Sequence, residues 1–314
     1  MIMPDFMYQL RQSSFSGFIR GLRGSLWIMR VILPVSLLIA LVQWTGWLFY
    51  LEFILKPLMA LINLPPEAFL PIVAGMFADV YGSIAAMVTL SFSIEQMTLI
   101  AIFSTISHSI IIEGIIQSKS GINFIKIISI RIATSALTVL LVSQFFPGTA
   151  YSIGGAEIAS VIPLTDVLLR WISDMLTLAV KVFLIVIAVM IGQEILISMG
   201  LIKYLQKLFK PVMKLMGLSD GVTVAWLVAI FAGVTVGAAV IIDECRKYLV
   251  SAEELENLHV SIGINHSIVE HTAILGALGI NMMWLSVPRL LTAVIAVHAL
   301  RGWRKLKQIF YPKA

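Results

Sequence analysis

Two stretches of the chain decide the fold, because residues 108–123 (HSIIIEGIIQSKSGIN) return 158 positions later as residues 266–281 (HSIVEHTAILGALGIN). The opening His-Ser-Ile and the closing Gly-Ile-Asn are identical in the two copies. Across residues 93–134, 12 of 42 positions are identical to their partners at this offset. Apolar matches arise from composition alone, but shared polar positions such as His-Ser indicate an internal duplication.

The repeat extends upstream at a slightly different offset. Residues 55–59 (LKPLM) return as residues 209–213 (FKPVM), 154 positions later. An insertion of four residues between the two matched regions accounts for the change from 154 to 158. We therefore expect two homologous halves, divided by the glycine-containing segment 147–161.

Composition places these halves in a membrane. The chain has 314 residues, of which 59% are hydrophobic and 12% charged, with a mean hydropathy of +0.98. Soluble globular domains have about 25% charged and 45–50% apolar residues. The composition excludes a soluble enzyme, a disordered chain and a nucleic-acid-binding protein, and it indicates a polytopic membrane protein. The single cysteine, Cys245, excludes a disulfide framework.

Hydrophobic stretches of about 20 residues predict the membrane crossings. Two further apolar stretches, 67–92 and 221–249, are either full crossings or hairpins that return to the same side. Each contains a polar or glycine-rich tip that divides it into two short arms, although residues 221–242 would also suffice for an ordinary span. The six predicted crossings are residues 27–50, 96–117, 124–146, 176–199, 252–275 and 282–300.

The distribution of basic residues favours the hairpins. With full crossings, the lysines of segment 201–216 would lie outside the cell if the N-terminus is inside. With hairpins, each half crosses three times, the second half is inverted, and 17 of the 22 basic residues face the cytoplasm. Only Lys56 and Arg170 then lie outside, as the positive-inside rule requires.

We therefore predict an all-α integral membrane protein of two inverted repeats, each with three transmembrane helices and a re-entrant helical hairpin, together with interfacial amphipathic helices. The expected location is a bacterial inner membrane, with both termini cytoplasmic. The predicted organisation is an interfacial N-terminal helix (1–25), a first membrane repeat (26–146), an extracytoplasmic linker and amphipathic segment (147–175), a second membrane repeat (176–300) and a basic cytoplasmic tail (301–314).

The pattern of hairpin, His-Ser helix and Gly-Ile-Asn turn in both halves resembles the nucleoside-recognition, or Gate, domain membrane proteins. That family is related to spore maturation proteins, to the membrane domain of the ferrous-iron permease and to concentrative nucleoside transporters. The resemblance covers about residues 27–300 and implies re-entrant hairpins that meet near the membrane midplane. It does not define a substrate, since the related proteins handle organic solutes and metals. The GxxxxGK[ST] motif of a nucleotide-binding domain is absent from the sequence.

Five ionisable residues are predicted near mid-membrane depth: His108, Glu113, His266, Glu270 and His271. A charged group there costs at least about 2.5–3.5 kcal/mol, so such residues usually mark a transport pathway or an ion pair. The histidines either line a cavity or hydrogen-bond across helices as structural contacts. Glu113 and Glu270 either bind cargo or pair with arginines that recur one helix later, Arg131 and Arg289 respectively.

Other candidates flank these residues or occupy the first hairpin tip. Asp79 at this tip is expected to bind the cargo, and His259 and His298 are expected to be solvated near helix ends. The spacing HxxxEH at 266–271 does not match the metalloprotease motif HxxEH, and no other catalytic motif occurs. We therefore expect no enzymatic activity and no cofactor. The remaining predicted substrate- or ion-binding residues are Gly82, Ser109, Asn265 and Ser267.

The predicted function is that of a permease, a secondary transporter that moves a small polar solute, nucleoside-like under the resemblance, by alternating access with proton or sodium coupling. One alternative is a divalent metal transporter, whose ligands would be His108, Glu113, His266, Glu270 and His271. Another is a non-transporting membrane scaffold or sensor. The expected partners are lipid, the solute or cation, and H⁺ or Na⁺, without nucleic acid. A homo-oligomer is left open.

Overall fold

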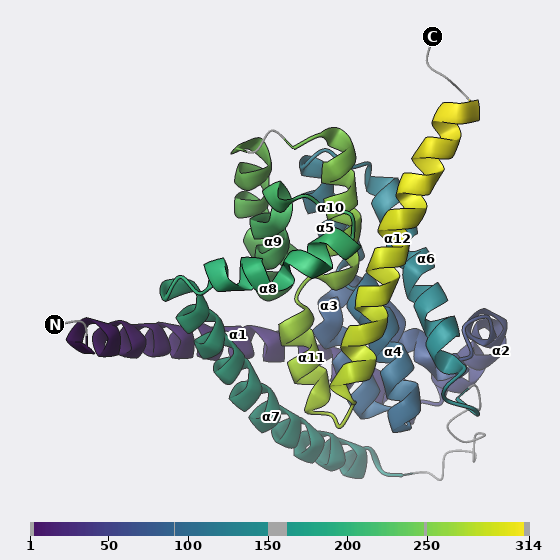
Figure 1. The fold of residues 1–314 in the computed structure, drawn as a ribbon. Coiled ribbons are helices and arrows are strands. Elements are labelled where there is room, and N and C mark those ends of the chain that lie inside the picture. The colour runs from purple at the N-terminus through teal and green to yellow at the C-terminus, as the bar shows by residue number, and fades with distance from the viewer. Residues whose placement is uncertain (1–2, 91, 150–161, 248–249, 311–314) are drawn as a thin grey trace.

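The computed structural model describes residues 3–90, 92–149, 162–247 and 250–310. All regular secondary structure in these residues is helical (Figure 1). No strand occurs among these residues, so the predicted all-α class is confirmed. The helices are, in chain order, α1 (Met3–Trp44), α2 (Trp47–Ala60), η1 (Pro66–Ala68), α3 (Phe69–Thr89), α4 (Ile94–Ser107), α5 (Ile110–Lys119), α6 (Phe124–Ser143), α7 (Leu164–Ser198), α8 (Ile202–Leu215), η2 (Asp220–Val222), α9 (Thr223–Lys247), α10 (Ala252–Asn265), α11 (Ile268–Gly276) and α12 (Met282–Phe310).

Six helical stretches of the described residues are long and apolar enough to cross a membrane. Five of them overlap predicted crossings. The predicted crossing 252–275 is not among the six, because α10 carries three glutamates near its start and a separate helix, α11, follows it. The six stretches are Met7–Trp44, Pro66–Thr89, Ile94–Lys119, Phe124–Ser143, Leu164–Ser198 and Met282–Phe310.

The second half of the chain repeats the helices of the first in the same order, so that α7–α12 correspond to α1–α6. The backbone bends also recur, since residues with positive φ occupy equivalent positions in both halves. Three pairs follow the offset of 154 and two the offset of 158, which is the same change of offset that the sequence shows. The pairs are Gly46 with Gly200, Asn63 with Gly217, Asp79 with Gly233, Ser109 with Ser267 and Gly121 with Gly279.

The chain folds back on itself within α3. Its helical geometry is interrupted at Ala78 and Asp79, where Asp79 has φ 72° and ψ 168°. A Cβ atom added to Gly82 would lie only 2.7 Å from the carbonyl oxygen of Ala74. Residues eight apart in a continuous helix are separated by about 12 Å along the axis, so the two arms of α3 must pack against each other. Gly82 therefore allows the close approach of the arms.

A second fold-back occurs at the equivalent position of α9. Gly233 has φ 80° and ψ 165°, almost the same conformation as Asp79. A Cβ atom on Gly237 would lie 2.7 Å from a side-chain atom of Val228, nine residues earlier. Helices α3 and α9 each thus consist of two packed arms joined at a bend, a local geometry called a hairpin below, with the tips at Asp79 and Gly233.

The helices predicted over 96–117 and 252–275 were expected to be continuous, but each is broken in the middle. His108 is extended and Ser109 is left-handed, so α4 ends there and α5 begins. His266 and Ser267 repeat this break between α10 and α11. The two breaks contact the hairpins, because the N–H groups of the two serines donate to carbonyl oxygens in the first arms of α3 and α9. Four interruptions of helix thus lie at the centre of the molecule.

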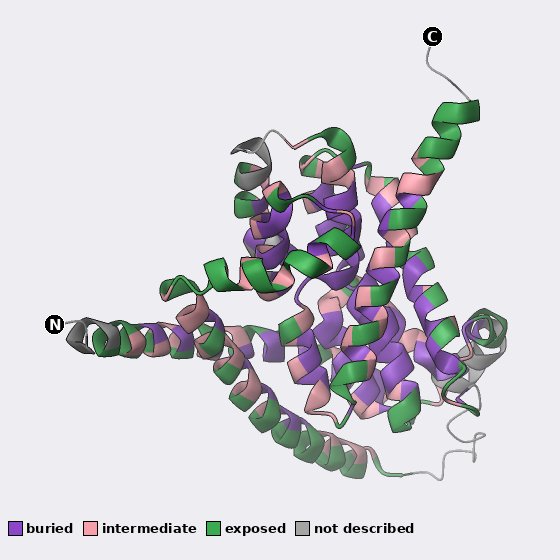
Figure 2. Cartoon of the chain, in the orientation of Figure 1, coloured by how far each residue is buried: buried purple, intermediate pink, exposed green. Residues whose placement is uncertain are grey.

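The long helices α1 and α7 pack along each other beside this centre. Helix α1 is continuous through residue 25, and α7 begins at Leu164, so neither predicted domain boundary at 25 or 175 coincides with a helix end. The backbones of α1 and α7 approach each other closely, since a Cβ atom on Gly21 would lie 2.6 Å from the Cα atom of Ile187. Buried residues concentrate in the central helices (Figure 2).

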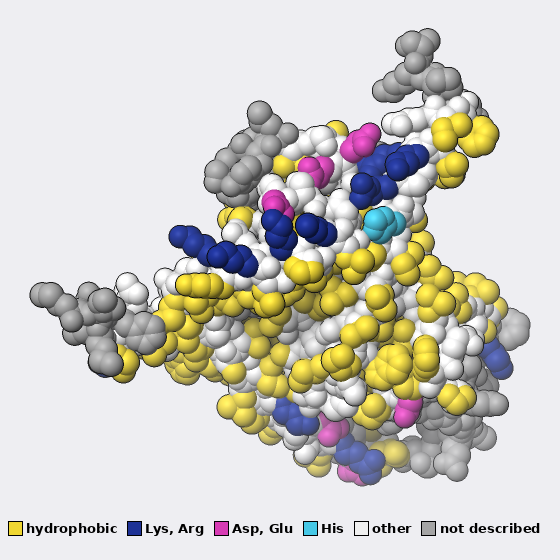
Figure 3. Space-filling model, viewed as in Figure 1, with side chains coloured by type: hydrophobic (Ala, Val, Ile, Leu, Met, Phe, Trp, Pro, Cys, Tyr) yellow, Lys and Arg dark blue, Asp and Glu magenta, His cyan; other side chains and the backbone are white. Residues whose placement is uncertain are grey.

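The face of the molecule drawn in Figure 3 carries a broad hydrophobic band, with a cluster of basic side chains on one side of it and fewer basic side chains, beside acidic ones, on the other. Exposed lysines of α8 belong to this basic region, and so does the C-terminal part of α12. The band has the appearance expected of a surface that contacts lipid tails, with the basic region at a headgroup level. The exposed lysines of α8 are Lys203, Lys207, Lys210 and Lys214.

Candidate functional site

A cavity of about 260 Å³ lies between the two hairpin tips, the broken helices and the pair α1 and α7. Its wall combines charged, aromatic and apolar side chains from both halves of the chain. The site therefore exists only when the two halves are assembled. The residues that line it are Arg20, Gly24, Trp27, Ile28, Asp79, Tyr81, His108, Glu113, Val186, Met190, Gln193, Gly233, Val234, Ser267, Glu270 and His271.

His108, His266 and Glu113 converge beside this cavity. The Nε2 atoms of the two histidines are 2.9 Å apart. The Oε1 atom of Glu113 lies 3.0 Å from the Nε2 of His266 and 3.5 Å from that of His108. All three side chains are buried, so these contacts are shielded from water. The two repeated histidines therefore lie side by side in the structure.

The Nδ1 atom of each imidazole fixes its tautomer when the ring is neutral. The Nδ1 of His266 lies 2.8 Å from the carbonyl oxygen of Ile262, and the Nδ1 of His108 lies 3.2 Å from that of Ser104. A carbonyl oxygen can only accept a hydrogen bond, so each Nδ1 carries the hydrogen. In the neutral histidines both Nε2 atoms are therefore lone-pair acceptors, and they face each other and a carboxylate.

Two buried arginines stabilise the broken helix ends. Arg131 donates to the carbonyl oxygens of Ile106 and His108, and its Nη1 lies 2.8 Å from Oε2 of Glu113. A helix break leaves its last carbonyl groups without partners, and a cation at a helix C-terminus also interacts favourably with the helix dipole. The predicted pairing of Arg131 with Glu113 is confirmed.

The equivalent arginine behaves differently. Arg289 donates to the carbonyl oxygens of Ile264 and His266, as the repeat requires, and to that of Thr105 in the other half. The predicted pairing of Arg289 with Glu270 is wrong, because the carboxylate of Glu270 instead accepts a hydrogen bond of 2.5 Å from the hydroxyl of Tyr81. At the offset of 158, Glu113 is equivalent to His271 and Glu270 to Ile112, so Glu270 lies one residue before the position that is equivalent to Glu113.

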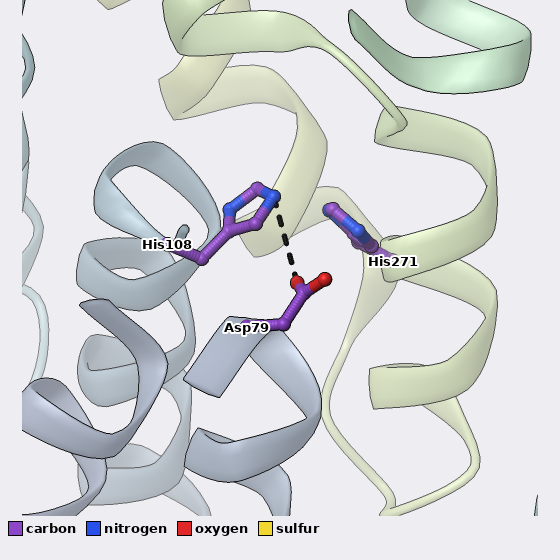
Figure 4. Close-up of side chains that lie close together, drawn as sticks. All are labelled: Asp79, His108 and His271. Carbon is purple, nitrogen blue, oxygen red and sulfur yellow. Dashed lines mark ion pairs between the residues drawn. The ribbon is translucent and has the colours of Figure 1, made fainter. Parts of the chain in front are cut away.

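Asp79, His108 and His271 form a second group that shares His108 with the first (Figure 4). The Oδ1 atom of Asp79 lies 3.9 Å from Nε2 of His108, and the imidazole of His271 stands edge-on to that of His108 with ring centroids 4.6 Å apart. Asp79 comes from the tip of α3 and His271 from α11. The side chain of Asp79 is 27% exposed, and Asp79 lines the cavity directly.

Comparison with known proteins finds a family model that covers the second half of this site. Residues 179–296 match the family model described as nucleoside recognition, named Gate. The match runs from α7 into α12 and includes His266, Ser267, Glu270 and His271, whereas Asp79, His108 and Glu113 belong to the first half.

A relative of the same length supports a membrane location. An uncharacterized membrane protein of Bacillus subtilis strain 168, YvoD, is 26% identical over 303 residues, which cover 95% of this chain and 97% of the relative. No solved structure matches. The protein is therefore a multi-pass membrane protein, and the predicted resemblance to the Gate family is confirmed over residues 179–296.

The other predicted site residues lie around the cavity. Ser267 lines the cavity, whereas Gly82 and Ser109 shape the hairpin contact and the helix break. Asn265 is fully buried, and neither polar atom of its side chain has a hydrogen-bond partner in the described part of the chain. The expectation of solvation is wrong for His259, which is 1% exposed in the packed centre of α10.

Several cavity residues were missed by the sequence analysis. Tyr81 lies within the hairpin tip, close to Asp79 in sequence, but its contact with Glu270 joins residues 189 positions apart. Trp27 packs edge-on against Tyr81 with ring centroids 5.9 Å apart, and Gln193 donates to the carbonyl oxygen of Phe231 beside the second tip. No motif identified Trp27 or Gln193, since each reads as an ordinary residue of a long apolar helix.

Proposed function

We propose that this protein is a membrane permease that moves a small polar solute through the cavity between the two hairpin tips. The cavity itself is the main support, since a space lined by Asp79, Tyr81, Glu270 and His271 offers both hydrogen-bonding groups and charge. Ligand pockets usually have volumes of about 300–1,000 Å³. At about 260 Å³, this one suits a solute no larger than a nucleoside rather than a lipid.

The topology that we propose has each half crossing three times, with α3 and α9 as re-entrant hairpins and the second half inverted. Inverted repeats with broken helices at their interface are a recurrent architecture of secondary transporters. Backbone outside helical geometry is tolerated at membrane depth only where it is buried in protein or lines a cavity, as at the four breaks. Both termini and the basic surface region would face the cytoplasm of the inner membrane.

The mechanism that we propose is alternating access, in which the two tips open the cavity to one side of the membrane at a time. Asp79, Glu270 and His271 bind the solute or carry its coupling ion, H⁺ or Na⁺. Tyr81 positions the Glu270 carboxylate through its hydrogen bond of 2.5 Å. No part of this mechanism requires a chemical change in the solute, so we propose a transporter rather than an enzyme.

The name of the Gate family favours a nucleoside as the solute. Uptake of radiolabelled uridine and adenosine into proteoliposomes, under an imposed proton or sodium gradient, tests this directly. We expect uptake by the wild type, at least a tenfold loss in Glu270→Gln and little change in His298→Ala, since His298 is exposed and far from the cavity lining. A wild type that moves neither nucleoside under either gradient would contradict nucleoside transport.

A divalent cation is the second candidate cargo, favoured by the two groups of histidine and carboxylate side chains at the cavity. Radiolabelled Zn²⁺ or Mn²⁺ in the same vesicles separates the two candidates. Movement of metal without nucleoside would identify the cation as cargo. Absence of every flux would instead favour the scaffold or sensor alternative.

A further inference from the structure

Besides the cavity's capacity to hold a solute, its most informative feature is the convergence of three ligand atoms from His108, His266 and Glu113. Their separations of 2.9, 3.0 and 3.5 Å define a compact triangle. A point about 2.1 Å from all three atoms lies about 1 Å above their plane, and bond lengths of about 2.0–2.2 Å are those of zinc to imidazole and carboxylate. We propose that these three residues bind one divalent first-row transition-metal ion.

The surrounding contacts orient these three side chains as the outer contacts of a metal site do. Ligating histidines usually donate their second ring N–H to a carbonyl or carboxylate, and ligating carboxylates are themselves hydrogen-bonded. Both histidines donate from Nδ1 to carbonyl oxygens of their own helices. The Oε2 atom of Glu113 forms an ion pair with Arg131, and its Oε1 atom faces the two Nε2 atoms.

The positions of the two rings distinguish an ion from a shared hydrogen. A hydrogen bond prefers a nearly collinear arrangement, in which two ring radii would add about 2.3 Å to the N–N distance. The ring centroids are 4.6 Å apart and the Nε2 atoms 2.9 Å, so the rings add only 1.7 Å. The two lone pairs are therefore inclined to the line between the nitrogen atoms, and Glu113 occupies the third corner.

Charge at the site also favours a cation. Three buried or half-buried carboxylates, those of Asp79, Glu113 and Glu270, oppose two buried arginines, Arg131 and Arg289. With neutral histidines this set carries a net charge of −1. Imidazole and carboxylate together suit divalent manganese, iron, cobalt, nickel or zinc, whereas magnesium and calcium prefer oxygen ligands alone. Three ligand atoms leave further coordination positions open, and Asp79 and His271 form a second group that shares His108 with the first.

Equilibrium binding tests the proposal without any transport assay. The protein is purified with a histidine-free affinity tag, placed in lipid nanodiscs, treated with a chelator and titrated with Co²⁺ at pH 7.5 by visible absorption. We expect one equivalent to bind, to be displaced by Zn²⁺, and to resist excess Ca²⁺ and Na⁺. His266→Ala and Glu113→Gln should weaken binding at least about a hundredfold, beyond the 10–100-fold typical of losing an outer contact.

Two further variants distinguish the loss of a metal ligand from the loss of folded protein. His266→Asp retains a ligand and should bind Co²⁺ more tightly than His266→Ala, while His298→Ala should bind as the wild type does. A wild type without cobalt absorption, or full binding in both His266→Ala and Glu113→Gln, would overturn the metal site. Because binding is measured at equilibrium, its failure leaves nucleoside uptake untouched, and failed uptake leaves the metal site untouched.

Discussion

The backbone at the first hairpin tip yields a prediction that separates stability from function. Asp79 has φ 72° and ψ 168°, and its repeat partner Gly233 has φ 80° and ψ 165°. This region of conformation is essentially restricted to glycine, and a residue with a side chain held there costs about 1–3 kcal/mol. The backbone of the first half is thus strained at Asp79, where the second half has Gly233. We infer that the strain is retained because the carboxylate of Asp79 is needed in the cavity.

The comparison of Asp79→Gly with Asp79→Ala isolates this strain. Both substitutions remove the carboxylate and its hydrogen bond of 2.6 Å from the N–H of Val80, but only glycine relieves the backbone. Relief of about 1–3 kcal/mol is offset by about 0.4–1 kcal/mol for the greater freedom of glycine in the unfolded chain. Asp79→Gly should therefore be more stable than Asp79→Ala by about 1.3 kcal/mol, the difference between the middle values of the two ranges.

Reversible unfolding in mixed micelles measures this difference, and proteoliposome uptake measures function in the same preparations. Both variants should lose uptake to the same extent, although they differ in stability. If Asp79→Ala is as stable as Asp79→Gly, the tip is not strained. If Asp79→Gly transports at the wild-type rate, the carboxylate has no role. Gly233→Ala serves as the converse control, because its Cβ would lie 2.6 Å from Oγ of Ser267 and should destabilise the fold.

Two further predictions concern the buried ion pair and the helix crossing. Arg131→Met leaves Glu113 buried without its cation and should cost about 3–5 kcal/mol. Adding Glu113→Gln should recover more than 1 kcal/mol, whereas strictly additive effects in unfolding titrations would refute the coupling. Gly21→Ala should destabilise by about 1–3 kcal/mol relative to Gly192→Ala, because a Cβ atom would meet the α7 backbone at Gly21 and no atom within 4 Å at Gly192. Equal thermal stabilities of these two glycine variants would contradict the close crossing.

The repeat made much of the architecture predictable. The offsets of 154 and 158 predicted which residues are equivalent, and the structure places a backbone bend at both members of five such pairs. The convergence of His108 and His266 followed from the same symmetry. These predictions succeeded because duplicated sequence carries duplicated local geometry, which needs no knowledge of distant contacts.

The helix breaks and the detailed pairing at the site were beyond sequence reasoning. Ser109 and Ser267 adopt left-handed conformations without glycine or proline beside them, since contacts with the hairpins and the arginines at the helix ends stabilise the breaks. A continuous helix was the reasonable prediction. The wrong pairing of Glu270 with Arg289 has another cause, since the equivalent of Glu113 at the offset of 158 is His271. The hydrogen bond from Tyr81 to Glu270 depends on how the two halves assemble, which no local pattern encodes.

Accessibility of the cavity from the two sides of the membrane tests the central claim of alternating access most directly. Val234 lines the cavity at the second tip, so Val234→Cys in a Cys245→Ser background places one thiol there. A membrane-impermeant thiol reagent is applied to right-side-out and inside-out vesicles, with and without a saturating solute identified in the uptake assay. We predict labelling from both sides, with the solute raising the rate on one side and lowering it on the other. Labelling from neither side, or from one side alone under every condition, would contradict the proposed mechanism.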